Sequence, residues 1–180
     1  QVDANYWDFA RWSTDRAARF AKKAYSFIHA MQHSQSDRIV WIDADVITVN
    51  SVSWDFLYTL LPDDVLSTHL GVVYDKTKTG QEGNWFVPET GFFAINTQHK
   101  YFDRFRNEYC RRYFEKDFDD LRRCYDNDVY GAAIKYCNTE CLDLCKDLTK
   151  TYKTPFKRTV LGPYLMHYKA KHSKKSFQRQ

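Results

Sequence analysis

The stretch Arg38-Ile39-Val40-Trp41-Ile42-Asp43-Ala44-Asp45 is the part of the sequence that most strongly indicates a fold. Its first five residues form a short apolar run rich in β-branched side chains, which is typical of a buried strand. Two aspartates follow at once, and like charges beside a buried strand are costly unless a cation compensates them. Carboxylate oxygens suit Mg²⁺ and Mn²⁺. We therefore expect Asp43 and Asp45 to hold a metal that binds a nucleotide pyrophosphate; the alternative is an ordinary Asp-x-Asp turn.

Helices and short strands are expected to alternate on both sides of this stretch. Apolar residues recur at helical spacing in two long segments, and apolar runs of strand length lie between them. The expected helices are 13–33, 54–61, 99–118 and one beginning near Asp126, and the expected strands are 38–42, 70–74 and 91–96. This order predicts an α/β fold with a largely parallel sheet, in which ligands bind at the carboxyl ends of the strands.

Three cysteines late in the chain are spaced four residues apart. Cys137, Cys141 and Cys145 would lie along one face of a further helix. Metal motifs more often pair thiols two to four residues apart around a turn. We therefore favour a buried helix stripe over a metal site.

A second motif, Glu89-Thr90-Gly91-Phe92-Phe93-Ala94-Ile95-Asn96, places a polar residue and a glycine before an apolar run. Gly91 would let a sugar or a backbone segment approach closely. The carboxylate of Glu89 would accept hydrogen bonds from sugar hydroxyls. The same pattern is also compatible with an ordinary loop that leads into a strand.

A third motif, Tyr125-Asp126-Asn127-Asp128-Val129-Tyr130-Gly131, begins a helix with carboxylates. A structural role as helix N-cap explains Asp126 alone. It does not require a second carboxylate at Asp128. The functional interpretation is a clamp for a donor sugar, in which one aspartate serves as a general base.

A fourth motif lies in the basic end of the chain, where residues 151–180 contain eight Lys or Arg and no Asp or Glu. His167 would be a third metal ligand through a ring nitrogen, and Lys169 and Lys171 would neutralise a leaving diphosphate. The structural alternative is a surface histidine in a solvated tail.

Size and composition indicate a single domain. The 180 residues are 43% hydrophobic and 17% aromatic, which supports a packed core and argues against disorder. We expect residues 1–172 to form the domain and 173–180 a basic tail, with no transmembrane segment. The odd count of five cysteines, without a secretory signal, favours reduced thiols and a cytoplasmic location.

Taken together and in this order, the four motifs resemble those of glycosyltransferases of the GT-A fold. Asp43-Ala44-Asp45 matches their metal-binding Asp-x-Asp motif, and the segment from Thr90 to Asn96 resembles their glycine-containing acceptor-side strand. Asp126-Asn127-Asp128 resembles the Asp-Gln-Asp element of the glycogenin-like and galactosyltransferase-like group. His167 with Lys171 resembles its C-terminal metal-binding histidine and phosphate-binding lysine. Small viral and bacterial members are also similar.

This resemblance implies a Rossmann-like, mostly parallel sheet flanked by helices. It also implies Mn²⁺ or Mg²⁺ as cofactor and a nucleotide sugar, such as a UDP-sugar, as donor. The chain departs from the pattern at Asn127, where Gln is usual, and at Ala170, where Gly is common. The expected helix at residue 13 lies close to the start, so part of the N-terminal nucleotide-binding unit is expected to be missing.

The expected activity is transfer of a hexosyl or pentosyl group to a hydroxyl of a glycan, protein or small molecule. Asp43, Lys169, Lys171 and Gly91 would bind the donor, while Asp126, Asp128 or Glu89 would orient the sugar and take the acceptor proton. The polar loop 75–84 would close over the donor.

Two alternatives stay open at this point. A nucleotidyltransferase also uses carboxylates and a divalent metal, although no glycine-rich phosphate loop is present near the start. A non-catalytic carbohydrate- or nucleic-acid-binding module would use the aromatic residues for stacking. We expect no nucleic-acid partner, because the net charge of +4 is low and the aromatics fall at core spacings.

Overall fold

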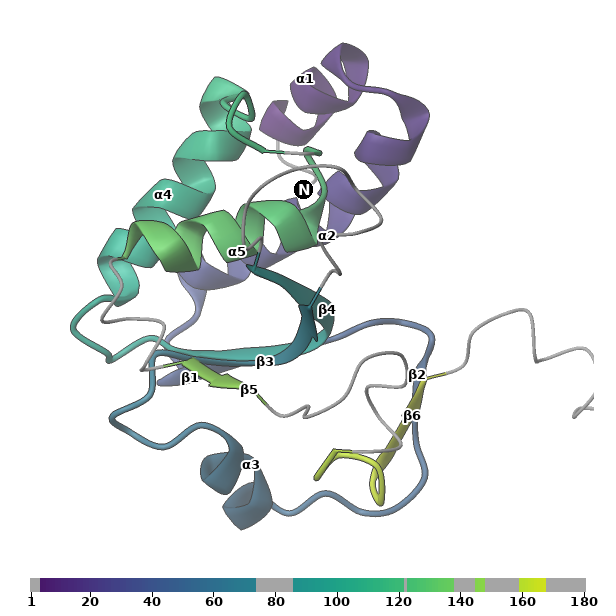
Figure 1. Cartoon of the computed structure of the whole chain (residues 1–180), viewed down its shortest axis with the longest axis vertical. Helices are drawn as coiled ribbons and strands as arrows, with labels where there is room; N and C mark the ends of the chain where they lie inside the picture. Colours follow the sequence, from purple (N-terminus) through teal and green to yellow (C-terminus); the bar gives the residue numbers. More distant parts are fainter. Residues whose placement is uncertain (1–3, 74–85, 122, 138–144, 148–158, 168–180) are drawn as a thin grey trace, which may run out of the picture.

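The computed structural model describes residues 4–73, 86–121, 123–137, 145–147 and 159–167 (Figure 1). The helices in these ranges are α1 (Ala4–Trp12), α2 (Asp15–His33), α3 (Trp54–Leu60), α4 (Phe102–Glu115) and α5 (Asp126–Tyr136). The strands are β1 (Arg38–Ile42), β2 (Val46–Thr48), β3 (Ser67–Val73), β4 (Phe86–Asn96), β5 (Cys145–Asp147) and β6 (Leu165–His167).

The main sheet has the strand order β1-β4-β3-β5 and is mostly antiparallel. Its longest strand, β4, pairs antiparallel with both β1 and β3. A short parallel pairing joins β5 to β3 at the edge, and β2 and β6 form a separate antiparallel pair. The prediction of a Rossmann-like, mostly parallel sheet was therefore wrong.

The physical reason for this error lies in β1. A continuous apolar run predicts a strand buried on both faces, which is typical of parallel sheets. In the structure Val40 and Ile42 are 39% and 42% exposed, so close packing by the layer of long helices is confined to the opposite face of β1. A strand covered by helices on one face alone is compatible with antiparallel pairing, and the apolar run by itself does not encode strand direction.

A helical layer covers one face of the main sheet, and α3 lies on the other side (Figure 1). The larger core cluster lies between the sheet and α1, α2, α4 and α5, and it includes Phe27, Phe93, Phe105 and Tyr130. A smaller cluster on the opposite side joins Leu60, Leu70, Phe92, Leu161 and Leu165. Phe92 and Phe93 are adjacent in β4 yet belong to different clusters, because successive strand residues point to opposite faces.

The long helices were predicted correctly, whereas several short elements were not. Thr14 caps α2 by accepting a hydrogen bond from the backbone N–H of Ala17. The expected cysteine helix is contradicted, because α5 ends before Cys137 and Cys145 begins β5. Cys141 lies outside the described residues, as do the expected lid 75–84 and the tail 173–180.

An irregularity in β4 shapes the region next to the end of β1. His69 pairs with Phe93, but the next residue, Leu70, pairs with Glu89. Residues 90–92 are therefore extra residues on β4 relative to β3. Bulges bend a strand and change the direction of its side chains, and they are frequent beside active sites.

No helix in the described part of the chain combines the length and apolar character that crossing a membrane requires.

Candidate functional site

The acidic turn after β1 is held by backbone contacts. The N–H of Asp43 donates to the carbonyl of Gly91 at 3.0 Å, which extends the pairing of β1 with β4 by one residue. The N–H of Val46 then donates to the carbonyl of Asp43 at 3.0 Å, closing a turn that leads into β2. The side chain of Asp43 is 30% exposed, and Asp45 is exposed on the turn.

Lys23 of α2 lies at the centre of the candidate site. Its Nζ is 2.8 Å from Oδ1 of Asp43 and 3.0 Å from Oδ2 of Asp126. It also donates a hydrogen bond to the carbonyl oxygen of Thr90. The Lys23 side chain is only 13% exposed. One ammonium group therefore connects β1, the β4 bulge and the start of α5.

Aromatic side chains surround the Lys23 ammonium on the helical face of the sheet. Nζ lies 5.5 Å from the centre of the Trp41 ring and 5.7 Å from that of Phe93. Both rings are within cation–π range. The indole N–H of Trp41 also donates to Oδ1 of Asp43 at 2.8 Å. These contacts hold both the ammonium and the carboxylate in one arrangement.

Lys23, Trp41, Asp43, Thr90 and Asp126 together form the Lys23 cluster. Asp126 is the more buried of its two carboxylates. It is 4% exposed and forms the first residue of α5. Thr90 donates its hydroxyl to Oδ2 of Asp126 at 2.6 Å, and the same oxygen faces Lys23. The expected N-cap role is wrong, because Tyr125 occupies the cap position. The nearby helix N-terminus still favours a negative charge at Asp126.

The β4 bulge places the second motif against the third. Thr90 is buried and points toward Asp126, while Gly91 binds the turn through its backbone. Glu89 is half-buried and lies within β4 opposite Leu70, rather than before the strand as expected. Thr90 was part of the sequence motif, but the sequence did not indicate that this threonine contacts Asp126.

Asp128 is separated from Asp126 by the geometry of the helix. Residues two apart on a helix point about 200° apart, so the two aspartates do not share a face. The side chain of Asp128 is 2% exposed, and its Oδ2 lies 3.6 Å from Nε of Arg123. The structure thus assigns the two carboxylates of the third motif to different surroundings.

The backbone of the fourth motif lies beside the turn that contains Asp43 and Asp45. In the β2–β6 pair His167 lies opposite Val46, the residue that follows Asp45. The register therefore brings the backbone of His167 beside the turn, as a metal-ligand role requires. The His167 side chain, Lys169 and Lys171 lie outside the part that the structure describes, so their roles stay predictions.

The residues around the turn fit a divalent cation in charge and donor type. Asp43, Asp45 and Asp126 carry three negative charges against the single positive charge of Lys23, so the group attracts a cation. Two carboxylates with an imidazole suit Mn²⁺ or Mg²⁺. Within the described residues no three His, Cys, Asp or Glu side chains are gathered around one point, so the described side chains alone supply an incomplete ligand set.

Lys23 and Trp41 are the site residues that sequence reasoning missed. One signal for Lys23 was present: it lies in a helical row with Phe20 and Phe27, at spacings of three and four residues. A lysine among aromatic residues on a core-facing row needs a negative partner. Nothing in the sequence identified which carboxylate that partner is.

Comparisons of this chain with models of protein families, with curated proteins and with solved structures gave no match.

Proposed function

We propose that the protein is a metal-dependent glycosyltransferase that moves a hexosyl or pentosyl group from a nucleoside-diphosphate donor to an acceptor hydroxyl. The observation that supports this proposal is the convergence on Lys23. Asp43, Thr90 and Asp126 come from three separate sequence motifs, and all three contact the same ammonium group. Motifs that were only similar in order to those of glycosyltransferases are thus also neighbours in space.

The residues that would hold the metal are Asp43, Asp45 and His167. A bound Mn²⁺ or Mg²⁺ would supply positive charge for the diphosphate that leaves the sugar. Lys169 and Lys171 would add to this charge. Lys23 contacts Asp43 from the side of α2, and Asp45 is exposed on the turn. Both carboxylates of the turn are thus at least partly accessible from solvent.

Asp126 is suited to orienting the donor sugar. Its Oδ2 is fixed by Thr90 and Lys23, so the carboxylate has little freedom to rotate. A fixed carboxylate accepts hydrogen bonds from sugar hydroxyls without losing entropy on binding. We therefore assign it to orientation rather than to proton transfer.

The reaction breaks the bond between the anomeric carbon and the diphosphate oxygen and forms a bond from that carbon to the acceptor oxygen. The electron pair of the broken bond leaves with the diphosphate, and the acceptor hydroxyl loses its proton. Glu89, half-buried on β4 next to Thr90, is the carboxylate we assign to take this proton. Asp128 faces Arg123 and has a supporting role at the start of α5.

A panel of nucleotide sugars tests the proposal. The wild-type chain is incubated with each donor and Mn²⁺, with and without EDTA, and release of the nucleoside diphosphate is measured. We expect release from one donor class, loss of that release in EDTA, and a fall of at least about 100-fold in Asp43→Asn, because the charge on the leaving diphosphate loses its stabilisation. Asp119→Asn, an exposed carboxylate beyond α4, is the matched control and should retain activity.

Two results would contradict the proposal. Folded protein that releases no diphosphate from any donor, with or without an added acceptor panel, is not a glycosyltransferase. Release of pyrophosphate from nucleoside triphosphates, without release of diphosphate from nucleotide sugars, would instead identify a nucleotidyltransferase.

A further inference from the structure

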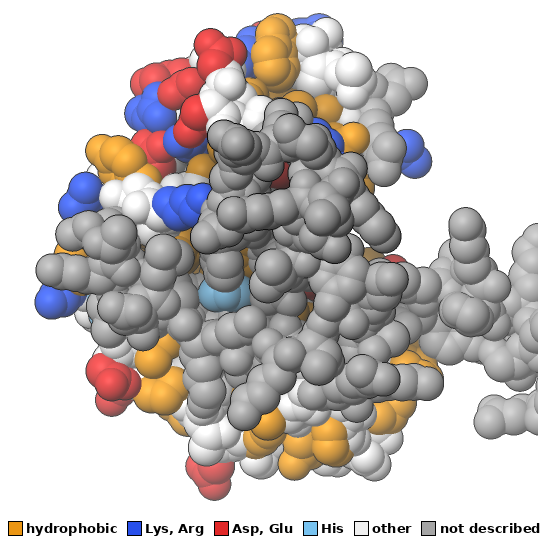
Figure 2. All heavy atoms as spheres, viewed as in Figure 1, with side chains coloured by type: hydrophobic (Ala, Val, Ile, Leu, Met, Phe, Trp, Pro, Cys, Tyr) orange, Lys and Arg blue, Asp and Glu red, His pale blue; other side chains and the backbone are white. Residues whose placement is uncertain are grey.

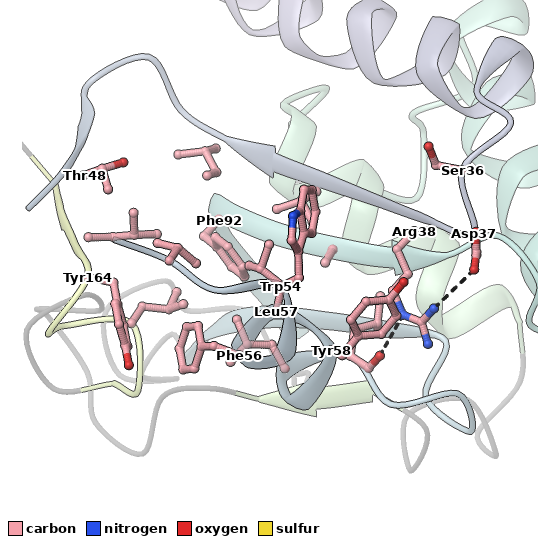
Figure 3. Close-up of a pocket in the computed structure, with 18 of the residues that line it drawn as sticks. Ser36, Asp37, Arg38, Thr48, Trp54, Phe56, Leu57, Tyr58, Phe92 and Tyr164 are labelled. Atoms are coloured by element: carbon pink, nitrogen blue, oxygen red, sulfur yellow. Dashed lines mark hydrogen bonds and ion pairs between the residues drawn. The ribbon is translucent and has the colours of Figure 1, made fainter. Parts of the chain in front are cut away.

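A cavity of about 800 Å³ lies between the sheet and α3 (Figure 3). Val40, Ile42 and Phe92 line it from the sheet, and Trp54 and Tyr58 line it from α3. Trp41 and Phe93, their neighbours in the strands, face Lys23 instead. Because side chains alternate along a strand, the cavity lies on the face of the sheet opposite the Lys23 cluster.

The walls of this cavity carry unusually exposed apolar side chains. Trp54 is 77% exposed and Tyr58 is 50% exposed, although both are large aromatic residues. In the view of Figure 2, hydrophobic side chains gather at the lower edge of the molecule, in the region of α3. Contiguous exposed apolar surface marks a binding site more often than chance solvent exposure does.

Polar groups are concentrated at one end of the cavity. Arg38 donates from Nε to the carbonyl of Leu61 at 3.0 Å and pairs with Asp63, and its guanidinium lies 4.5 Å from the centre of the Tyr58 ring. Figure 3 shows Arg38 and Asp37 beside Tyr58, with Phe56, Phe92 and Tyr164 at the other end. The volume is within the roughly 300–1,000 Å³ of small-ligand sites, which are likewise apolar with a few fixed polar groups.

The cavity reaches the residues on either side of the segment that contains the acidic turn. Ile42 and Thr48 both line it, and they flank the segment that contains Asp43 and Asp45. A molecule seated against Ile42 therefore lies one residue away from the proposed metal ligand Asp43. This position is on the side of the sheet away from Asp126, so an acceptor there would approach the donor from a separate direction.

We propose that this cavity binds an aromatic group of the acceptor, and that this group carries the hydroxyl which receives the sugar either directly or on a sugar attached to it. The inference rests on the proposed glycosyltransferase function and extends it by naming the acceptor class as aryl alcohols or aryl glycosides. Trp54 and Tyr58 supply flat surfaces for stacking, and Arg38 at the polar end gives the aromatic group one orientation.

Direct binding tests the cavity independently of catalysis. 2-Naphthol is titrated into the wild-type chain, Trp54→Ala and Trp7→Ala by calorimetry, and Trp7 serves as the control because it is 54% exposed on α1, away from the cavity. We expect about ten-fold weaker binding in Trp54→Ala, from the loss of stacking and apolar contact, and no change in Trp7→Ala. Equal affinity in all three proteins, or no binding at all, overturns the cavity as a ligand site.

Acceptor kinetics then test the assignment to the transfer reaction. With the donor identified by its hydrolysis, KM is compared for a 4-nitrophenyl glycoside and the methyl glycoside of the same sugar. Trp54→Ala should raise KM for the aryl acceptor about ten-fold and so remove the wild-type preference for it over the methyl acceptor, whereas Trp7→Ala, the control outside the cavity, should leave both KM values and donor hydrolysis unchanged. Equal KM values for the two acceptors in the wild type overturn the aryl assignment, even if 2-naphthol binds.

Two further results separate this inference from the function on which it rests. Absence of donor hydrolysis, together with 2-naphthol binding that depends on Trp54, contradicts the proposed function and the acceptor assignment but keeps the cavity. A dimer in light scattering that Trp54→Ala converts to a monomer would identify the apolar wall as an interface between copies, and the acceptor proposal would then be wrong.

Discussion

At the scale of single residues, the positive charge of Lys23 offsets the cost of removing the carboxylates of Asp43 and Asp126 from water. Asp126 is 4% exposed, and a buried carboxylate without a cationic partner pays a desolvation cost. Lys23 compensates Asp126 and Asp43 with one charge at 3.0 and 2.8 Å. The role of this lysine is therefore structural as well as electrostatic, and its effects on stability and on activity are measurable separately.

Replacement of Lys23 by methionine keeps the length and apolar packing of the side chain and removes its charge. We expect Lys23→Met to lower the free energy of unfolding by about 3 kcal/mol, because it leaves a buried carboxylate without its cation. Urea denaturation measures this change, and Lys22→Met, at an exposed position on the same helix, is the control.

A double substitution tests whether the uncompensated charge of Asp126 causes this loss of stability. Lys23→Met combined with Asp126→Asn should recover part of the lost stability, because the uncompensated charge is then gone. If Lys23→Met is as stable as Lys22→Met, the contacts around Lys23 do not stabilise the fold and our account of the cluster is wrong.

The sequence predicted part of this cluster and could not predict its centre. Asp43 was singled out because two carboxylates follow an apolar run, and Asp126 because the expected helix start carries more carboxylates than capping requires. Thr90 was inside a predicted motif, but a threonine next to a glycine has many ordinary roles. Lys23 was missed because its partners are distant along the chain, and only tertiary packing brings α2 to the end of β1.

At the scale of elements, α4 is connected to the turn that follows it by partly buried ionic contacts. Arg112, whose side chain is 8% exposed, contacts Glu108 one turn earlier and Asp120 beyond the helix end. Its guanidinium binds both oxygens of Asp120, at 2.6 and 3.0 Å. The hydrogen bond from Arg112 lowers the pKa of Asp120 below its usual value.

This lowered pKa predicts a pH dependence of stability. A carboxylate whose pKa is lower in the folded than in the unfolded state stabilises the fold above its unfolded pKa, near about pH 4, and this contribution disappears as pH falls through the folded pKa. Near pH 7, Asp120→Asn should be less stable by no more than about 1 kcal/mol, because the carboxylate is largely exposed and screened by solvent.

Thermal unfolding across this range checks the prediction, with Asp119→Asn as the control. The difference between the wild type and Asp120→Asn should become smaller as the pH falls toward the lowered pKa of Asp120. A difference that stays constant with pH would show that the Arg112–Asp120 pair does not contribute through the charge of Asp120.

The two longest helices were predictable, whereas the nine-residue α1 was not. The helical periodicity of 13–33 and 99–118 extends over several turns, and α2 and α4 lie within these ranges. The strands β2, β5 and β6 have three residues each, which is too short for an alternating pattern to be visible. The cysteine spacing mimicked a helical stripe although Cys145 is in a strand, since spacing alone does not exclude a break in the chain direction.

At the scale of the whole molecule, the sheet separates two regions of different chemistry. The helical side holds the Lys23 cluster and the larger core, and the opposite side holds the aromatic cavity and the smaller core. The turn from Asp43 to Asp45 lies at the end of β1, where both regions meet. Strand direction, which sets this arrangement, was not predictable from apolar runs, because such runs are similar in parallel and antiparallel sheets.

We propose that the turn from Asp43 to Asp45 binds a divalent cation. Calorimetric titration of Mn²⁺ into the wild-type chain, Asp43→Asn, Asp45→Asn and the control Asp119→Asn tests it most directly. Our account predicts binding in the wild type and the control, and at least about ten-fold weaker binding in each turn variant, because each loses one charged ligand. Equal Mn²⁺ affinity in all four proteins, or no affinity in the wild type, would contradict the account.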